Sequence, residues 1–156
     1  MQTVILYATK HGAAREIAAR IADCVGNAQL CDLKQGDIPD LTGFDCVIIG
    51  SSLYAGSIRK EAKAFLAQNA GILRDKKLGL FLSGMAGSDT SKYFTDNFPA
   101  DIRAAAIASA FLGGIFDPQK ANKMERLIMK AVTKQSGYVN TIDDATIKQF
   151  ATQMQG

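Results

Sequence analysis

The stretch TVILYATKHGAAREIAA, residues 3–19, runs from an apolar segment through a small polar turn into an amphipathic segment. Residues 4–7 form a β-rich apolar run, which is typical of a strand buried on both faces. Apolar residues then recur at the spacing of a helix packed on one side: Ala14, Ile17, Ala18, Ile21, Ala22 and Val25. The turn at residues 8–13 leaves N–H groups free at the start of this helix, where they and the helix dipole favour an anion. The stretch therefore predicts a strand–helix unit with an anion site between its two elements.

Length and composition narrow the class of protein. The 156 residues suffice for one domain with a full hydrophobic core, so we expect a single domain over residues 1–156. The net charge is only +3, and no Lys/Arg cluster is interleaved with aromatic residues, which argues against nucleic-acid binding. No apolar stretch reaches the roughly 18 residues that would cross a bilayer. The N-terminal residues lack the basic and cleavage regions of a signal peptide, so a cytoplasmic protein is expected.

The cysteines do not indicate a metal site. Cys24, Cys31 and Cys46 form no C-x-x-C pair, and His11 is the only histidine. Because a structural zinc ion takes four ligands, we expect no metal site here. The three cysteines are interpreted as small buried hydrophobic residues in a reducing compartment.

Strands and helices are predicted to alternate along the chain. Further strands are expected at residues 28–32, 44–50, 78–82 and 106–112, and further helices at residues 58–70, 90–98, 119–134 and 143–154. This alternation predicts an α/β fold, a three-layer doubly wound parallel five-stranded sheet. With right-handed crossovers the leading strand order is 2-1-3-4-5, which places a ligand crevice at the carboxyl ends of strands 1 and 3.

Three loops are predicted to meet at this crevice, at residues 8–13, 51–56 and 83–88. They are rich in Ser, Gly and Ala, so the backbone can approach a ligand closely. Neither the dinucleotide fingerprint nor the Walker A motif is present, and a mononucleotide phosphate is the better fit to the first loop. The alternative is an ordinary turn that binds nothing.

The first loop resembles a known signature. Residues 5–18 look like the FMN-phosphate motif of flavodoxins, with Tyr7, Thr9, Gly12 and Ala18 at matching positions. Residues 44–52 are similar to the third strand of flavodoxins and the loop beside the flavin ring. Ala14 departs from the motif, because the family usually has a hydroxyl residue there. One neutral hydrogen bond contributes about 0.5–1.5 kcal/mol, so this departure implies weakened rather than abolished FMN binding.

Two further segments resemble a group within this superfamily. Residues 49–56, and the late-helix residues 124–130 followed by Ser136-Gly137, are similar to the flavodoxin-domain group that includes menaquinone-dependent protoporphyrinogen dehydrogenases. Those dehydrogenases carry a longer basic loop after the fourth strand, whereas residues 83–99 here are short and not basic.

The resemblance implies FMN as the cofactor and assigns three groups of residues to it. The phosphate is expected to be held by Thr9, Lys10, His11, Gly12 and Ala13. The flavin ring is expected to lie beside Ser51, Ser52, Leu53, Tyr54, Ala55 and Gly56, with Tyr54 stacking on it. The pyrimidine edge is expected to meet the backbone of Ser83, Gly84, Met85 and Ala86.

Several of these residues have a structural role as an alternative to a role in flavin binding. His11 is expected to be a solvated loop residue that partly supports the phosphate, with Lys10 and Arg15 adding positive charge. Met85 is expected either to fill a gap in the core or to contact the flavin. Met124, Leu127 and Ile128 of the late helix are interpreted as core residues, with a quinone groove as the alternative.

Three functions remain open at this point. The first is an FMN-binding redox protein that passes electrons between redox proteins or a quinone. The second is a quinone-linked protoporphyrinogen dehydrogenase, and the third is a binding module of the same fold without tight flavin. No Ser/His/Asp set or carboxylate pair forms a credible catalytic site, so no catalytic residues are assigned. The +3 charge is unusual for a flavodoxin. It suggests either partners unlike the usual basic-faced reductases or a weakly cationic side that faces an anionic membrane or substrate.

Overall fold

A parallel sheet forms the centre of the molecule. The computed structural model describes residues 1–85, 89–133 and 137–156, with the backbone alone for residues 132 and 133. The sheet has the order β2-β1-β3-β5-β6, made by β2 (Ala28–Asp32), β1 (Thr3–Ala8), β3 (Cys46–Tyr54), β5 (Lys77–Ser83) and β6 (Ala106–Phe111). These neighbours all pair in parallel. The predicted order of the five parallel strands is confirmed.

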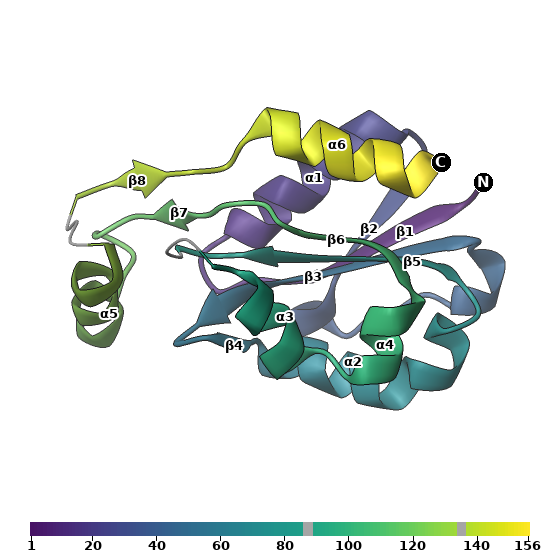
Figure 1. Cartoon of the computed structure of the whole chain (residues 1–156), viewed down its shortest axis with the longest axis horizontal. Helices are drawn as coiled ribbons and strands as arrows, with labels where there is room; N and C mark the ends of the chain where they lie inside the picture. The colour runs from purple at the N-terminus through teal and green to yellow at the C-terminus, as the bar shows by residue number, and fades with distance from the viewer. Residues whose placement is uncertain (86–88, 134–136) are drawn as a thin grey trace.

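Helices cover both faces of this sheet (Figure 1). One face carries α1 (Ala13–Val25) and α6 (Asp144–Gln155). The other carries α2 (Lys60–Leu73), α3 (Ser91–Asn97) and α4 (Ala100–Ala105), together with the short 3-10 turns η1 (Leu33–Gln35) and η2 (Leu41–Gly43). Strand β1 serves both layers, because its side chains alternate: Val4 and Leu6 join the α2-side core, whereas Ile5 and Tyr7 join the α1-side core.

An extra unit, here called the insert, lies between β6 and α6. It comprises β7 (Ile115–Phe116), α5 (Lys123–Thr133) and β8 (Val139–Asn140), and β7 pairs antiparallel with β8. Figure 1 shows the insert extending beyond the sheet at the end where β5 and β6 terminate. It has a small core of its own, in which Phe116, Ala121 and Met129 contact Met85 and Val139.

The prediction of a loop at residues 51–56 is wrong in conformation. Strand β3 continues through Tyr54, and a two-residue turn at Ala55-Gly56 leads into β4 (Ser57–Ile58), which pairs antiparallel with β3. The following helix consequently begins at Lys60 rather than at Ile58. Glycine and serine content suggested a loop, but pairing along both β1 and β5 keeps residues 51 and 52 extended.

The core interpretation of the late helix is also wrong. Helix α5 begins at Lys123, not at Gln119, and its Met129 packs with Phe116 and Val139 of the insert's two strands rather than on the sheet. Met124 and Leu127 are each 57% exposed, and Ile128 is half-buried. The helical periodicity was correct, but it carries no information about which neighbour covers the apolar face.

The three cysteines are not placed for thiol chemistry. Cys31 and Cys46 are buried, Cys24 is half-buried, and all three are free thiols. Burial raises the pKa of the Cys31 and Cys46 thiols, which keeps them protonated and unreactive. Within residues 1–85, 89–133 and 137–156, no helix is long and apolar enough to span a bilayer, and no group of three or more potential metal ligands is found.

Candidate functional site

A cavity of about 420 Å³ lies where the carboxyl ends of β1, β3 and β5 face the insert. Its volume falls within the range of small-molecule sites. Most of the predicted site residues line it: Thr9, Lys10, His11, Ala13, Ser52, Leu53, Tyr54, Ala55, Gly56, Ser83, Gly84 and Met85. Three segments that are far apart in the sequence therefore converge on one cavity at the carboxyl ends of the strands, where open parallel sheets bind their ligands.

Two predicted residues do not line the described cavity, and the structure leaves a third undescribed. Ser51 is fully buried, and its hydroxyl accepts a hydrogen bond from the Arg59 N–H (2.9 Å) and donates to the Ser52 carbonyl (2.9 Å). Gly12 lies at the start of α1 with φ +100°, a backbone conformation that favours glycine. Ala86 lies outside the described residues.

The loop between β1 and α1 is organised by hydroxyl groups. Thr9 Oγ1 accepts the Gly12 N–H at 2.8 Å, and Ser52 Oγ on β3 accepts the Lys10 N–H at 3.2 Å. The first intrahelical bond runs from the Glu16 N–H to the Gly12 carbonyl (3.0 Å). The N–H groups at the start of α1 have no intrahelical acceptor, and they remain suited to an anion. Ala14 is fully buried in the α1-side core.

Glu125 of α5 reaches back to this loop. Its two carboxylate oxygens lie 3.0 Å from Lys10 Nζ and 2.8 Å from His11 Nε2. Burial acts to raise the pKa of Glu125, but hydrogen bonds from Lys10, the Asn122 N–H and His11 outweigh it and lower the pKa below its usual value. We call these two contacts of Glu125 the clasp. His11 is exposed, as expected for a solvated loop histidine, and its ring also contacts Glu125.

Arg15 does not contribute charge to the cavity. Its guanidinium donates to Asp32 Oδ2 at 2.9 Å, on strand β2, and lies over the Tyr7 ring. The Asp32 hydrogen bond is the main cause of a raised pKa for Arg15. Lys10, in contrast, lies 4.1 Å from the centre of the Tyr54 ring, so it joins the first loop to the second.

The tip of the β3–β4 hairpin has an unusual backbone. Ala55 and Gly56 both have positive φ, +50° and +82°, as a type I′ two-residue turn requires. Asn97 of α3 clamps this turn, because its Nδ2 donates to the Gly56 carbonyl (2.8 Å) and its Oδ1 accepts the Ile58 N–H (3.0 Å). Tyr54 is consequently presented to the cavity by a well-anchored hairpin.

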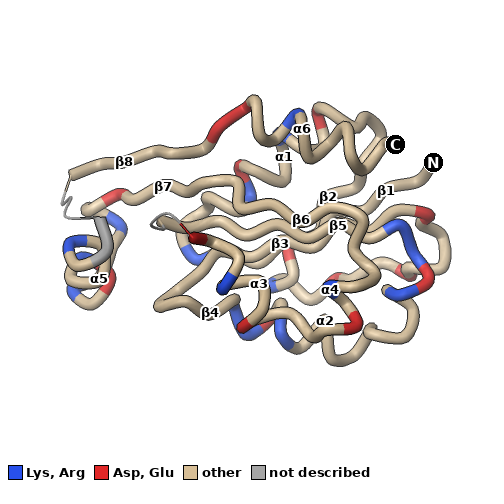
Figure 2. The backbone as a smooth tube through the Cα atoms, in the orientation of Figure 1, with Lys and Arg blue, Asp and Glu red and all other residues tan. Residues whose placement is uncertain are grey.

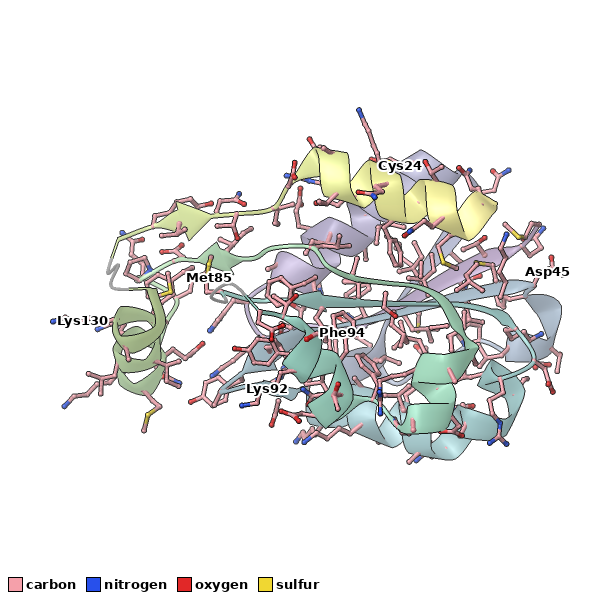
Figure 3. All side chains as sticks on the ribbon, in the orientation of Figure 1. Cys24, Asp45, Met85, Lys92, Phe94 and Lys130 are labelled. Atoms are coloured by element: carbon pink, nitrogen blue, oxygen red, sulfur yellow. The ribbon has the colours of Figure 1, made fainter. Side chains whose placement is uncertain are left out.

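The end of β5 contributes an unpaired polar atom. Ser83 Oγ is fully buried at the cavity and has no hydrogen-bond partner within the described residues. The neighbouring Gly84 N–H is used, since it donates to the Gly113 carbonyl at 3.1 Å. Gly114 packs so closely on Gly84 that an added Cβ would lie 2.8 Å from the Gly84 carbonyl oxygen. Met85 both lines the cavity and joins the core of the insert, where Figure 3 labels it.

The sequence analysis missed the second half of the cavity wall. It is formed by one residue of α3 and by the insert: Tyr93, Ile115, Phe116, Asp117, Ala121, Glu125, Ile128 and Met129. The similarity of residues 124–130 to a helix of a known group was the one feature of the sequence that pointed to this wall. The sequence pattern around these residues does not show that the helix lies beside the phosphate loop.

Comparison with known proteins identifies the relatives of this chain. Residues 4–142 match the family model described as a flavodoxin domain. No curated protein matches the chain. Among solved structures, a short-chain flavodoxin associated with a PDU bacterial microcompartment superposes with a TM-score of 0.63 and 18% identity, covering 99% of this chain and 97% of that one.

Two further structures show the same likeness. Flavodoxin 2 from Bacillus cereus has a TM-score of 0.61 and 18% identity, with 99% of this chain and 98% of that chain covered. A flavoprotein from Lactobacillus acidophilus, solved in complex with FMN, has a TM-score of 0.51 and 18% identity, with 72% and 91% covered. At these identities the structural likeness establishes a flavodoxin-like fold.

Proposed function

This chain belongs to the flavodoxin-domain family, and from that membership we propose that it binds FMN in the cavity and uses it to pass electrons between redox partners. One observation carries the proposal: the loop after β1 and the carboxyl ends of β3 and β5 contribute Thr9, Tyr54 and Ser83 to a single cavity. We further propose that these partners are redox proteins or a quinone. The free cysteines support the cytoplasm as the compartment in which this occurs.

The residues of the cavity fit the three chemical parts of FMN. The N–H groups at the start of α1, with Thr9 and Lys10, suit a phosphate. The ring of Tyr54 offers a stacking surface for a planar heterocycle. Ser83 Oγ, buried and unpartnered among the described residues, suits a polar edge of that heterocycle. When bound, FMN supplies one- or two-electron transfer chemistry.

The protein's own contribution is to bind, orient and exclude water. Apolar side chains from the insert, among them Phe116, Ile128 and Met129, complete the cavity opposite the three loops. A low-polarity wall strengthens each hydrogen bond inside and keeps solvent from the reacting atoms. The clasp holds this wall against the phosphate loop.

The proposal is tested by titrating the purified chain with FMN and with riboflavin while recording flavin fluorescence. We expect FMN to bind in the micromolar range or tighter and riboflavin to bind more weakly, because riboflavin lacks the phosphate. Thr9→Ala is expected to raise the FMN dissociation constant roughly two- to tenfold, the effect of one hydrogen bond. Thr152→Ala, on the exposed surface of α6, is the matched control. Absence of FMN binding would favour a binding module of this fold without tight flavin.

A second candidate function is a quinone-linked protoporphyrinogen dehydrogenase. The observation that favours it is the apolar wall from the insert, which provides contacts for an apolar substrate beside the flavin loops. The assay is anaerobic turnover of protoporphyrinogen with a menaquinone analogue and the FMN-loaded chain. Turnover would support the enzyme, whereas flavin reduction by a reductase without turnover would support the electron carrier.

A further inference from the structure

Helix α5 exposes an apolar stripe to solvent. Met124 and Leu127 are each 57% exposed, and Ala131 is exposed as well. These residues are spaced i, i+3 and i+7, so they lie along one side of the helix. We call Met124, Leu127 and Ala131 the outer stripe.

The opposite side of α5 is held against the protein. Met129 packs with Phe116 and Ala121, and Glu125 pairs with Lys10 and His11 across the cavity. The helix is thereby oriented by contacts on its inner side, and the outer stripe faces solvent because of this orientation. Exposing two large apolar side chains on one stripe is unfavourable in water, which marks the stripe as a candidate contact surface.

Positive charge is concentrated around the same helix. Residues 117–134 contain five Lys or Arg and two acidic residues, a net charge of +3, which equals that of the whole chain, so the remainder is neutral. Lys120, Lys123, Arg126 and Lys130 are exposed. One of the two acids, Glu125, is already paired in the clasp. Figure 2 shows the blue segments on α5, and Figure 3 shows Lys130 extending away from the body.

We propose that the outer stripe and these cations bind an anionic phospholipid surface. Basic residues beside an apolar stripe are the features by which an amphipathic helix lies in a bilayer interface. Long Lys and Arg side chains keep their charge at the headgroups while the apolar residues enter the acyl boundary. The helix projects from the body as a convex element (Figure 1), a shape that meets a broad planar surface without requiring a groove in the partner.

The location of the stripe gives this contact a consequence. Glu125, Ile128 and Met129 of the same helix line the cavity, so a bilayer bound to the outer stripe lies beside the cavity wall. A hydrophobic reactant dissolved in the membrane would then be close to the candidate site. The membrane contact itself does not depend on FMN and stands apart from the proposed redox function.

The test is co-sedimentation of the full chain with phosphatidylcholine vesicles, with and without phosphatidylglycerol, at low and at high salt. We expect binding to the anionic vesicles alone, weakened by salt because exposed charges are screened. Replacing Lys123 and Lys130 by Gln is expected to weaken binding about fivefold for each charge removed. Met124→Gln with Leu127→Gln is expected to weaken it at least tenfold, because apolar burial is lost.

Matched variants elsewhere on the surface provide the control. Leu30→Gln removes an exposed apolar residue from β2, and Lys63→Gln with Lys148→Gln removes two cations from α2 and α6. These variants are expected to bind vesicles as the parent does, and circular dichroism checks that every variant folds. The measurement is made with and without added FMN, so that vesicle binding is scored even if FMN does not bind.

Four results would overturn the proposal. The first is no sedimentation with anionic vesicles at low salt, and the second is an equal loss in the stripe and control variants. The third is self-association in size-exclusion chromatography that the Met124/Leu127 variant abolishes, without vesicle binding; the stripe would then be a contact between copies of the chain. Capture by an acidic protein without vesicle binding would likewise assign the stripe to a protein partner.

Discussion

At the scale of single residues, Glu125 is expected to oppose anion binding in the cavity. It places a carboxylate against Lys10 and His11, the two side chains of the phosphate loop that can carry positive charge at the cavity. A phosphate bound there must share these two side chains with the carboxylate or displace it. The clasp therefore stabilises the insert at the expense of anion affinity.

Glu125→Gln is expected to tighten FMN binding roughly two- to tenfold relative to riboflavin, because a like charge beside the phosphate is removed. The measurement is the ratio of the two dissociation constants from flavin fluorescence. Glu61→Gln on α2 is the control and should leave the ratio unchanged. A weaker affinity for FMN would show instead that Glu125 acts mainly by holding the insert over the ligand.

Gly50 of the central strand β3 leaves no room for a side chain. A Cβ at this position would lie 2.0 Å from the Phe81 ring, which is fully buried on the neighbouring strand β5. Gly50→Ala is expected to lower the free energy of unfolding by about 1–3 kcal/mol, the usual cost of overpacking a core. Urea denaturation measures this change.

Gly71→Ala serves as a comparison, because it is expected to change the free energy of unfolding in the opposite direction. Gly71 lies inside α2 with no atom within 4 Å of an added Cβ. Because alanine favours the helix, this substitution is expected to raise the free energy of unfolding by about 0.5–1 kcal/mol. If both variants destabilise the protein equally, the close packing of Phe81 on Gly50 is not the cause.

At the scale of elements, the conformation of the β3–β4 hairpin could not be predicted from the composition of residues 51–56. The residues of the predicted loop do reach the cavity, but they do so on a strand and a tight turn. Residues 51 and 52 of β3 are kept extended by β1 and β5, which are distant in the sequence, and residues 53 and 54 pair with the adjacent β4. Composition therefore predicted the location of this segment correctly and its conformation incorrectly.

The positive φ angles of this turn predict how substitutions at its two residues change the stability of the protein. Ala55 is a non-glycine residue with φ +50°, a conformation that costs an L-residue about 1–2 kcal/mol. Ala55→Gly relieves this strain but adds chain entropy to the unfolded state, so we expect a gain of less than about 1 kcal/mol. Gly56→Ala, at φ +82°, is expected to destabilise by about 1 kcal/mol. Thermal unfolding of the pair measures both effects, and a stabilising Gly56→Ala would contradict the assignment of a type I′ turn.

At the scale of the whole molecule, alternation of strands and helices was enough to predict the sheet order. Right-handed crossovers leave few arrangements for five parallel strands, and the observed order is the expected one. The same rule predicted which loops meet, so residues as distant as Thr9 and Met85 were correctly grouped. The insert could not be placed in this way, because its position depends on long-range contacts such as those of Glu125 and Met129.

The clasp makes the attachment of the insert depend on pH. The folded-state pKa of Glu125 lies below its ordinary value of 4.5. Its stabilising contribution is therefore fully present above that ordinary value, and it is lost as the pH falls through the lower, folded-state pKa. Hydrogen exchange of the α5 amides is expected to accelerate over this acid range in the parent protein. In Glu125→Gln, exchange of these amides should already be faster near neutral pH and change less on acidification, while β1 remains protected in both. An identical acid response in the two proteins would show that other carboxylates, such as the hydrogen-bonded Asp40 and Asp89, control the opening.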